Sequence, residues 1–289
     1  MKVLSGPSST MFGTSLARFM DCSLVDREIT RFPDGELYVR IMEDVTDEFV
    51  VLVQTTYPDE HIVELFVLQD ALREAGVSKL ATVVPYFGYS RQDKLFRAGE
   101  AVTARAMARH IQLESDHLIF VDLHSPRIRE WCDVNALEVH ASQDIANHLV
   151  ENGVEIDFVL SPDKGAIDRA SRVAEALGVP FDHLEKKRLD GENVIMTAKS
   201  LDVTGRDVLI VDDIIATGGT IIKAAEQLRR NGAGKIHAAC THGLYTGGSI
   251  PRLREALDGL YSSDTIESGT SVFSAARPVA EALKTISRG

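Results

Sequence analysis

Cysteine is scarce in this chain of 289 residues, and the three that occur follow no pattern. Cys22, Cys132 and Cys240 are widely separated and odd in number, which argues against a disulfide framework and against a cysteine-based metal site. Long apolar runs are also lacking: no stretch approaches the ~18 residues of a membrane span. The N-terminal MKVLSGPSST does not read as a signal peptide. We therefore expect a cytoplasmic protein that does not enter a membrane.

Positive charge is in short supply as well. The chain has 31 Lys and Arg against 43 Asp and Glu, which gives a net charge of −12. Nucleic-acid-binding proteins usually present a basic surface, so we expect no nucleic-acid partner. Small anionic ligands are not excluded, because local clusters of cations decide their binding. The 44% hydrophobic and 26% charged residues are typical of a folded globular protein, and the length suits about two domains.

The most informative segment is residues 207–221, which read DVLIVDDIIATGGTI. The apolar run Val208–Val211 predicts a strand that is buried on both faces of a parallel sheet. Asp212 and Asp213 follow at its C-terminal end, where open α/β sheets bind ligands. The glycine-rich stretch after them leads into an amphipathic helix, predicted over Ile221–Asn231.

This segment combines two kinds of recognition. Carboxylates accept hydrogen bonds from sugar hydroxyl groups, whereas glycines and the N–H groups of a helix N-terminus accommodate a phosphate. The hydroxyl groups of Thr217 and Thr220 add further donors. The segment therefore predicts a site for a phosphorylated sugar. The alternative is an ordinary strand–loop–helix turn in which the aspartates only cap the helix.

The two halves of the chain repeat each other. At an offset of 156 residues, Val3-Leu4-Ser5 aligns with Val159-Leu160-Ser161, and Asp34-Gly35-Glu36 aligns with Asp190-Gly191-Glu192. Strands and helices are predicted in the same order in both halves. Strands that alternate with helices indicate right-handed crossovers and a mostly parallel sheet.

We therefore expect two duplicated α/β domains, residues 1–140 and residues 141–289, each a mostly parallel sheet flanked by helices. A last helix is predicted over Pro278–Ser287, and the sequence leaves open whether it packs on its own domain or on the first. The halves differ where the sugar-phosphate segment lies, because Thr56 aligns with Asp212. Only the second domain is expected to bind a sugar phosphate in this way.

Two segments of the first half place polar groups next to strands. Residues Arg31–Arg40 read as a turn around Pro33-Asp34-Gly35 followed by a strand, and a plain hairpin is the simplest interpretation. Residues Pro85–Lys94 follow the predicted strand Lys79–Val84. Their aromatic and basic side chains form either a structural edge or a clamp for phosphate groups, to which Arg91 would offer a fork of donors.

Asp122 and His124 come directly after the buried strand predicted over Leu118–Val121. Alternation along a strand would place both side chains on one face. A hydrogen-bonded structural pair and a metal site are both compatible with this spacing.

Residues 159–166, VLSPDKGA, read as a strand, a loop and the start of a helix. Asp163 or Ser161 is expected to be the N-cap residue, and the helix is predicted over Ile167–Leu177. A cap at this position also faces any ligand bound at the end of the strand.

Residues 184–191, LEKKRLDG, carry the densest positive charge in this acidic chain. Three adjacent cations repel one another unless an anion binds there. On a strand, Lys186 and Arg188 would point to one face and Lys187 to the other. A solvated surface hairpin is the alternative.

Over roughly Lys2–Ser274, these motifs resemble those of the ribose-phosphate pyrophosphokinases. The tandem acids and the Thr-Gly-Gly-Thr loop are shared with phosphoribosyltransferases, whereas Phe-Pro-Asp-Gly-Glu at 32–36 is typical of the pyrophosphokinases. The resemblance implies two phosphoribosyltransferase-like domains. It also implies transfer of the pyrophosphoryl group of Mg-ATP to the 1-hydroxyl of ribose 5-phosphate, giving phosphoribosyl pyrophosphate and AMP for nucleotide, histidine and tryptophan biosynthesis.

The resemblance assigns roles to the residues that match its motifs. It implies that Lys186 and Arg188 are catalytic and that His124 and Asp163 bind magnesium, with Asp122 orienting the histidine or reaching the metal through water. The residues implied to bind ATP are Phe32, Asp34, Gly35, Glu36, Arg91 and Gln92. The residues implied to bind ribose 5-phosphate are Arg188, Asp212, Asp213, Ala216, Thr217, Gly218, Gly219 and Thr220.

In this family the segment at 32–36 reaches into the active site of a neighbouring subunit. The resemblance therefore implies at least a homodimer with a shared active site, with the dimer contacts and the ATP side in the first domain. Ala216 stands where many bacterial and animal members have an acid, and the segment between Lys94 and Val102 is short. Both features are closer to the archaeal branch, and they put the bacterial allosteric ADP site in doubt.

Two rival interpretations stay open. A phosphoribosyltransferase would use the same sugar-phosphate loop, but it needs neither Phe32–Glu36 nor Arg91-Gln92. A non-catalytic regulatory relative would keep the fold, but it would lose the residues that match catalytic positions, and those are intact here.

Overall fold

The computed structural model describes residues 1–188, 194–197 and 202–287, and for residues 185–188 and 194–197 it describes the backbone only. The chain divides into two compact units. The first comprises Met1–His140, Asp264–Glu267 and the C-terminal segment from Ser274. The second comprises Ala141–Ser263 and Ser268–Phe273.

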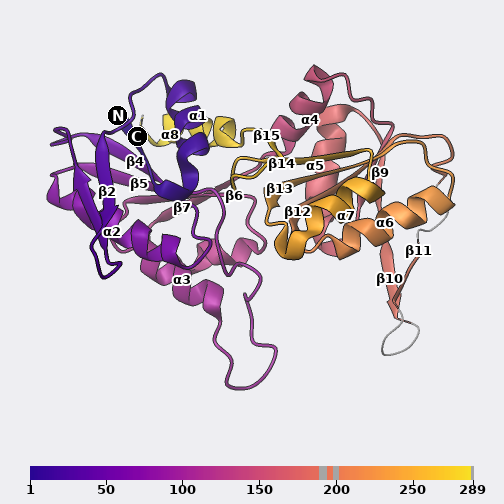
Figure 1. Cartoon of the computed structure of the whole chain (residues 1–289), viewed down its shortest axis with the longest axis horizontal. Coiled ribbons are helices and arrows are strands. Elements are labelled where there is room, and N and C mark those ends of the chain that lie inside the picture. The colour runs from indigo at the N-terminus through magenta and orange to yellow at the C-terminus, as the bar shows by residue number, and fades with distance from the viewer. Residues whose placement is uncertain (189–193, 198–201, 288–289) are drawn as a thin grey trace. The chain divides into compact units, whose positions relative to one another are not determined.

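The first unit is built on a five-stranded parallel sheet (Figure 1). Across the sheet, the strands lie in the order β1 (Lys2–Ser5), β4 (Phe49–Val53), β5 (Lys79–Val84), β6 (His117–Val121) and β7 (Asn135–Val139). Its α-helices are α1 (Thr10–Met20), α2 (Glu60–Glu74), α3 (Thr103–Ile111) and α8 (Ala276–Ile286). Two 3₁₀ helices, Pro7–Ser9 and Pro126–Trp131, follow β1 and β6.

The C-terminal helix α8 belongs to the first unit. It packs against α1 (Figure 1), and buried apolar side chains such as Leu16 on α1 and Leu283 on α8 line the two helices. The Lys284 ammonium group also donates to the carbonyl oxygen of Phe19, 3.3 Å away. The chain thus returns to the first unit after completing the second.

The second unit is built on a six-stranded parallel sheet. Across it, the strands lie in the order β15 (Ser271–Phe273), β14 (Gly259–Ser263), β13 (Ile236–Gly243), β12 (Val208–Ile215), β8 (Phe158–Ser161) and β9 (Phe181–His183). Its α-helices are α4 (Ser142–Glu151), α5 (Ile167–Leu177), α6 (Gly219–Arg230) and α7 (Ser249–Ala256). Two 3₁₀ helices, Lys164–Ala166 and Thr246–Gly248, precede α5 and α7.

Both faces of this second sheet are covered, as its continuous apolar strands require. Leu209 and Val211 pack under α4 and α5, whereas Val208 and Ile210 pack under α6 and α7. Figure 1 shows these two helix pairs on opposite sides of the sheet. The period-two alternation of β12 therefore distributes one apolar run between two cores.

The sheets confirm the predicted duplication. The order β1-β4-β5-β6-β7 in the first unit matches β8-β12-β13-β14-β15 in the second, and each sheet is parallel throughout. Each unit also carries a separate antiparallel hairpin: β2 (Arg27–Arg31) with β3 (Leu37–Ile41), and β10 (Glu185–Arg188) with β11 (Val194–Thr197). This order of elements is the one predicted from the repeat.

Two boundaries differ from the prediction. Strand β12 does not end at Val211 but continues to Ile215, because β13 stays paired with it as far as Ile215↔Gly243. Helix α6 begins at Gly219, two residues earlier than expected, so the glycine-rich stretch forms its first turn.

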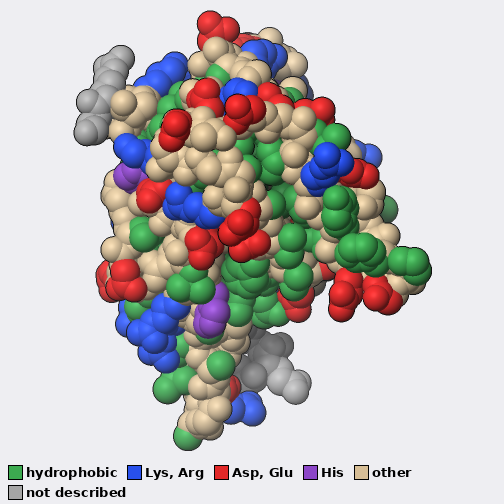
Figure 2. Space-filling view, turned by 90° about the vertical axis from the view of Figure 1, so that its left-hand side faces the viewer, with side chains coloured by type: hydrophobic (Ala, Val, Ile, Leu, Met, Phe, Trp, Pro, Cys, Tyr) green, Lys and Arg blue, Asp and Glu red, His purple; other side chains and the backbone are tan. Residues whose placement is uncertain are grey.

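Figure 2 shows the side of the molecule that lies at the left of Figure 1. On this face, acidic and basic side chains are interspersed, and Lys and Arg do not gather into one basic patch. Over the described ranges of the chain, no helix is long and apolar enough to cross a membrane.

Candidate active site

One edge of the second sheet gathers the predicted sugar-phosphate residues. Strands β8 and β12 are parallel neighbours, so their C-terminal ends meet at the same edge. Asp163 follows β8, and Asp212 and Asp213 lie in the last half of β12. Helix α6 starts from the same strand end. The structure thus brings Asp163, Asp212, Asp213 and residues 216–220 together, as the motifs predicted.

The acids at this edge repel one another. Asp213 is buried, and one of its carboxylate oxygens lies 3.5 Å from Nη2 of Arg169. Asp212 accepts a hydrogen bond from the backbone N–H of Asp213. Burial raises the pKa of the Asp212 carboxyl well above its usual range, and the negative charges of Asp213 and Asp163 raise it further. A cation or hydroxyl donors would relieve this repulsion.

Arg169 is a site residue that the sequence did not single out. It stands on the first turn of α5 and also donates from Nη1 to the carbonyl oxygen of Gly165, at 3.3 Å. It therefore joins the loop that carries Asp163 to the strand that carries Asp213. No local signal in the sequence distinguishes Arg169 from Arg172 on the same helix, which pairs with the exposed Asp168.

Asp163 is the N-cap residue of the short helix Lys164–Ala166. Its carboxylate accepts a hydrogen bond from the Gly165 N–H at 2.9 Å. The predicted cap was that of the helix Ile167–Leu177, but the N-cap residue of α5 is Ala166, whose side chain makes no cap, and Asp163 caps the 3₁₀ helix that precedes α5.

The loop before α6 has the features of a phosphate cradle. Gly218 adopts the left-handed conformation, with φ of +75°, and α6 begins at the next residue. The first N–H groups of a helix have no intrahelical acceptor, and its dipole favours an anion there. Ala216, Thr217 and Thr220 flank these donors.

The segment that leads into α7, and α7 itself, contact this loop on the protein side. The Ala216 carbonyl oxygen accepts from the Thr246 N–H at 3.0 Å and from the buried Ser249 hydroxyl at 3.2 Å. A Cβ atom added at Gly218 would lie 2.8 Å from the Leu253 side chain. The loop therefore has a fixed position, and a larger residue does not fit at 218.

The β2–β3 hairpin of the first unit presents the predicted adenine-binding residues. Phe32 is 51% exposed, and its ring packs edge-on against Tyr38 with centroids 5.7 Å apart. Gly35 has φ of +94°, and Asp34 accepts from the Glu36 N–H at 3.1 Å. The turn is thus closed by its own hydrogen bonds and leaves an aromatic face exposed.

Arg91 and Gln92 lie in the loop after β5. Arg91 is exposed. Gln92 has a structural contact that the sequence did not predict: its side-chain oxygen accepts from the Thr103 hydroxyl at 3.0 Å, and its carbonyl oxygen accepts from the Ala104 N–H. Gln92 therefore ties this loop to the start of α3.

The strand alternation from which Asp122 and His124 were predicted to share one face does not extend to these two residues. Strand β6 ends at Val121, and Asp122 has φ of +40°, a left-handed conformation that breaks the alternation. As a result Asp122 is buried and His124 is exposed. The Asp122 carboxylate is hydrogen-bonded to Nδ1 of His140, 2.8 Å away, a partner that the sequence did not reveal.

Lys186 and Arg188 lie in β10, where they pair in register with Met196 and Val194 of β11. The predicted hairpin is present. The side chains of Lys186 and Arg188 fall outside the described residues.

A magnesium site made by the protein alone is not found in the described part of the chain, where no three His, Cys, Asp or Glu side chains form a metal-binding group. His124 belongs to the first unit and Asp163 to the second. Magnesium usually keeps several waters and takes one or two carboxylates together with substrate phosphates. Asp163, beside two more acids, fits that requirement.

Comparison with known proteins identifies the family of this chain. Residues 1–113 match the model of the N-terminal domain of ribose phosphate pyrophosphokinase, and residues 134–276 match that of the phosphoribosyl transferase domain. The ribose-phosphate pyrophosphokinase of Methanopyrus kandleri is 42% identical over 99% of this chain and 100% of its own length. That of Pyrococcus furiosus is 45% identical over 86% of this chain and 88% of its own.

A solved structure is similar over the same length. The crystal structure of phosphoribosylpyrophosphate synthetase from Mycobacterium smegmatis has a TM-score of 0.85 and 26% identity, and the match covers 99% of this chain and 98% of that one. Both halves of this chain therefore match family models, and curated relatives match it almost end to end. The chain belongs to the ribose-phosphate pyrophosphokinase family.

Proposed function

We infer that this chain transfers the pyrophosphoryl group of Mg-ATP to the 1-hydroxyl of ribose 5-phosphate, forming phosphoribosyl pyrophosphate and AMP. The observation that carries the inference is the edge of the second sheet, where acids and a helix N-terminus are combined in one place. Family membership and the ATP-type hairpin of the first unit distinguish this reaction from that of a simple phosphoribosyltransferase.

Ribose 5-phosphate would bind with its phosphate on residues 216–220 and its hydroxyl groups on the acids. The N–H groups of the first turn of α6 would donate to the phosphate. Asp212 and Asp213 would accept from the 2- and 3-hydroxyl groups. Sugar hydroxyls supply hydrogen-bond donors to neighbouring carboxylates whose negative charges repel one another, which favours binding at this position.

ATP would bind to the first unit. Phe32 would stack on the adenine, and Asp34, Gly35 and Glu36 would contact its polar edge. Arg91 and Gln92 would bind the nucleotide phosphates, for which a guanidinium group offers a fork of donors. We propose further that the hairpin serves the active site of a second copy, so that the working enzyme is at least a homodimer.

Magnesium would be held by His124 beside the nucleotide and by Asp163 beside ribose 5-phosphate, in each case together with phosphate oxygens of the substrate. When bound, it would neutralise the polyphosphate and orient it. Asp122 does not ligate it in this proposal; its bond to His140 fixes the backbone next to His124.

The chemical step requires positioning and charge stabilisation rather than a covalent intermediate. The 1-hydroxyl oxygen attacks the β-phosphorus in line with the bond to the leaving AMP. The roles that the resemblance gives to Lys186 and Arg188 are to stabilise the charge on the transferred and leaving groups. We further expect a cytoplasmic enzyme.

A phosphorus NMR time course with ATP, magnesium and ribose 5-phosphate tests this function. A new pyrophosphate ester together with an equal amount of AMP is the expected result. Formation of ADP would show an ordinary kinase and overturn the proposal. If neither product forms while ribose 5-phosphate still binds, the pyrophosphokinase assignment fails and a phosphoribosyltransferase or a regulatory role replaces it.

A further inference from the structure

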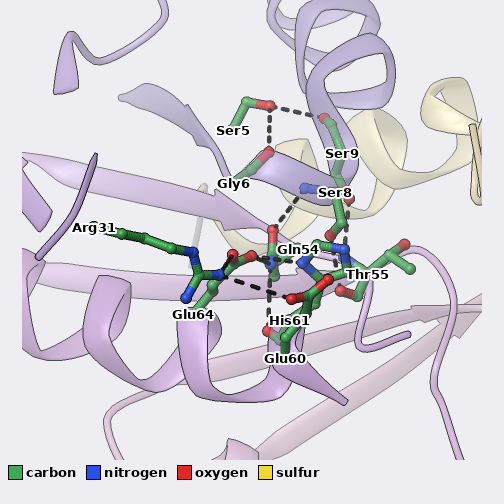
Figure 3. Close-up of polar contacts among 10 residues, drawn as sticks. All are labelled: Ser5, Gly6, Ser8, Ser9, Arg31, Gln54, Thr55, Glu60, His61 and Glu64. Atoms are coloured by element: carbon green, nitrogen blue, oxygen red, sulfur yellow. Dashed lines mark hydrogen bonds and ion pairs between the residues drawn. The ribbon is translucent and has the colours of Figure 1, made fainter. Parts of the chain in front are cut away.

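A buried carboxylate lies near the turn end of the β2–β3 hairpin. Glu64, on the first turns of α2, is 5% exposed, and its two oxygens have three partners (Figure 3). Nη2 of Arg31 lies 3.2 Å from Oε1. Nδ1 of His61 and Nε2 of Gln54 lie 2.6 Å and 3.1 Å from Oε2. The charge of Glu64 is therefore compensated within the fold.

The other terminal amino group of Arg31 donates a hydrogen bond to the turn itself. Its Nη1 donates to the carbonyl oxygen of Gly35 at 3.0 Å. The guanidinium group is half exposed, yet it spans two fixed points, one on α2 and one on the turn Phe32–Glu36. A planar fork of donors suits this task, because the direction of one bond fixes the direction of the other. Glu60, 3.8 Å from Arg31 and exposed, adds little.

The partner of Arg31 is itself anchored to the central sheet. Gln54 follows β4, is fully buried, and donates to both Glu64 and the carbonyl oxygen of His61. A Cβ atom at Gly6 would lie 1.9 Å from Oε1 of Gln54, so the glycine leaves room for this side chain. Glu64 thus has one partner that follows a strand of the sheet, Gln54, and one on its own helix, His61.

The hairpin depends on such anchoring. It is a separate two-stranded sheet without ladder hydrogen bonds to the five-stranded one, and an isolated hairpin is marginally stable. Ile29, Val39 and Ile41 pack on the core along its strands. At the turn end, Phe32 is exposed, and the Arg31–Glu64 pair is the polar tie that reaches Gly35.

We propose that Arg31 and Glu64 are positioning residues for ATP, which fix the turn Phe32–Glu36 in the conformation that meets the nucleotide base. The proposal rests on the inferred function of this hairpin. Neither residue contacts the nucleotide; both act through the turn. They therefore affect the binding and discrimination of the base and leave the sugar-phosphate site unchanged.

The test uses Glu64→Gln, which keeps the shape of the side chain and removes its charge, and Arg31→Lys, which keeps the charge but loses the fork. We expect Glu64→Gln to raise KM for ATP about tenfold, because a charge-assisted bond is lost, with KM for ribose 5-phosphate within about twofold of wild type. Discrimination between ATP and GTP should weaken in parallel. Arg31→Lys should fall between wild type and Glu64→Gln.

Asp116→Asn is the matched control. Asp116 pairs with Arg73 at the opposite end of α2, 3.0 Å apart, and accepts from the Leu80 N–H. Removing the charge of Asp116 should change neither the KM for either substrate nor the discrimination between ATP and GTP. The proposal is overturned if Glu64→Gln leaves KM for ATP unchanged, or if KM for both substrates rises equally.

Two further measurements keep the test decisive. If Glu64→Gln fails to fold, the half-exposed Arg31→Lys gives the same comparison, and unchanged ATP parameters in that variant refute the proposal. If the wild-type protein shows no pyrophosphokinase turnover, calorimetric binding of ATP replaces KM. In that case the proposed function fails, while a weaker Kd for ATP in the variants still supports the positioning role and an unchanged Kd refutes it.

Discussion

At the scale of single residues, charge determines the chemistry of the candidate site. Asp212 lies among like charges, and its carboxyl pKa is raised by burial and by Asp213 and Asp163. Nη2 of Arg169 lies 3.5 Å from a carboxylate oxygen of Asp213. The site therefore gains most from ligands that donate hydrogen bonds or carry positive charge, and a sugar with magnesium offers both.

Replacing Asp212 tests this point. We expect Asp212→Asn to raise KM for ribose 5-phosphate at least about tenfold, since a hydrogen bond to a charged acceptor contributes roughly 1.5–3 kcal/mol. KM for ATP should change little. Asp258→Asn is the control, because that carboxylate caps the other edge of the same sheet by accepting from the Ile236 N–H. Equal effects of the two substitutions would contradict the assignment of Asp212.

The burial of Asp264 can be tested by the pH dependence of the protein's stability. Its carboxylate is buried and accepts from the N–H of Ala275, the N-cap residue of α8, and burial raises its pKa to about 6. The folded state therefore holds this proton more tightly than the unfolded state, whose pKa is near the ordinary value of 3.8. The contribution of this group to stability falls as pH rises from about 4 to about 6, and then stays low.

The corresponding experiment is urea unfolding of wild type and Asp264→Asn. The amide does not ionise, so the variant should gain stability relative to wild type, and the gain should be about 1 kcal/mol larger at pH 8 than at pH 5. A gain that does not depend on pH would show that Asp264 is not buried in its charged form.

The residues that the sequence missed share one property. Arg169 and His140 act through partners on other elements, Asp213 and Asp122. Motif spacing identifies acids and glycines next to a strand end, because those lie within one segment. Pairing between segments depends on the packed structure, and a surface arginine or histidine looks the same in the sequence whether or not it has such a partner.

At the scale of elements, the loop before α6 determines where a phosphate would bind. Gly218 is needed there for two reasons, its positive φ and its contact with Leu253. The loop and the helix could be predicted from the sequence, but the contacts of Thr246 and Ser249 with the loop could not. Helix α5 has the predicted bounds, Ile167–Leu177, whereas α6 starts early, because the glycines join its first turn.

A comparison of alanine substitutions at Gly205 and Gly218 separates the cost of the positive φ from the cost of the contact with Leu253. Gly205 has φ of +72° with nothing within 4 Å of an added Cβ, whereas Gly218 has φ of +75° and would meet Leu253 at 2.8 Å. Alanine at either position should cost about 1 kcal/mol for the left-handed backbone. Only Gly218→Ala should lose more stability and raise KM for ribose 5-phosphate several-fold. Equal unfolding midpoints and unchanged KM would refute the role of the contact.

At the scale of the whole chain, the two duplicated units carry different predicted ligand sites. The predicted ATP residues all lie in the first unit and the sugar-phosphate loop lies in the second. The alternation of strands and helices sufficed to predict two parallel sheets. The unit on which α8 packs could not be predicted. An apolar stripe that includes Val279 and Leu283 indicates that the helix is packed, but it does not identify the surface that covers it.

Helix α8 should therefore stabilise the first unit specifically. Leu283→Ala removes a fully buried side chain and should cost about 2–5 kcal/mol. Hydrogen exchange should increase in α1 and β1 and remain as in wild type in α6 and β12. Faster exchange in the second unit alone would contradict the assignment of α8 to the first.

The central claim is that the 1-hydroxyl oxygen of the sugar attacks the β-phosphorus of ATP. The bond between this phosphorus and the oxygen that bridges it to the α-phosphorus is then broken. ATP labelled with ¹⁸O in the bridge between its α- and β-phosphorus atoms tests this directly, with mass spectrometry of both products. Attack at the β-phosphorus predicts that all of the label leaves with AMP. Label in the pyrophosphate ester, or ADP as the product, would contradict the claim.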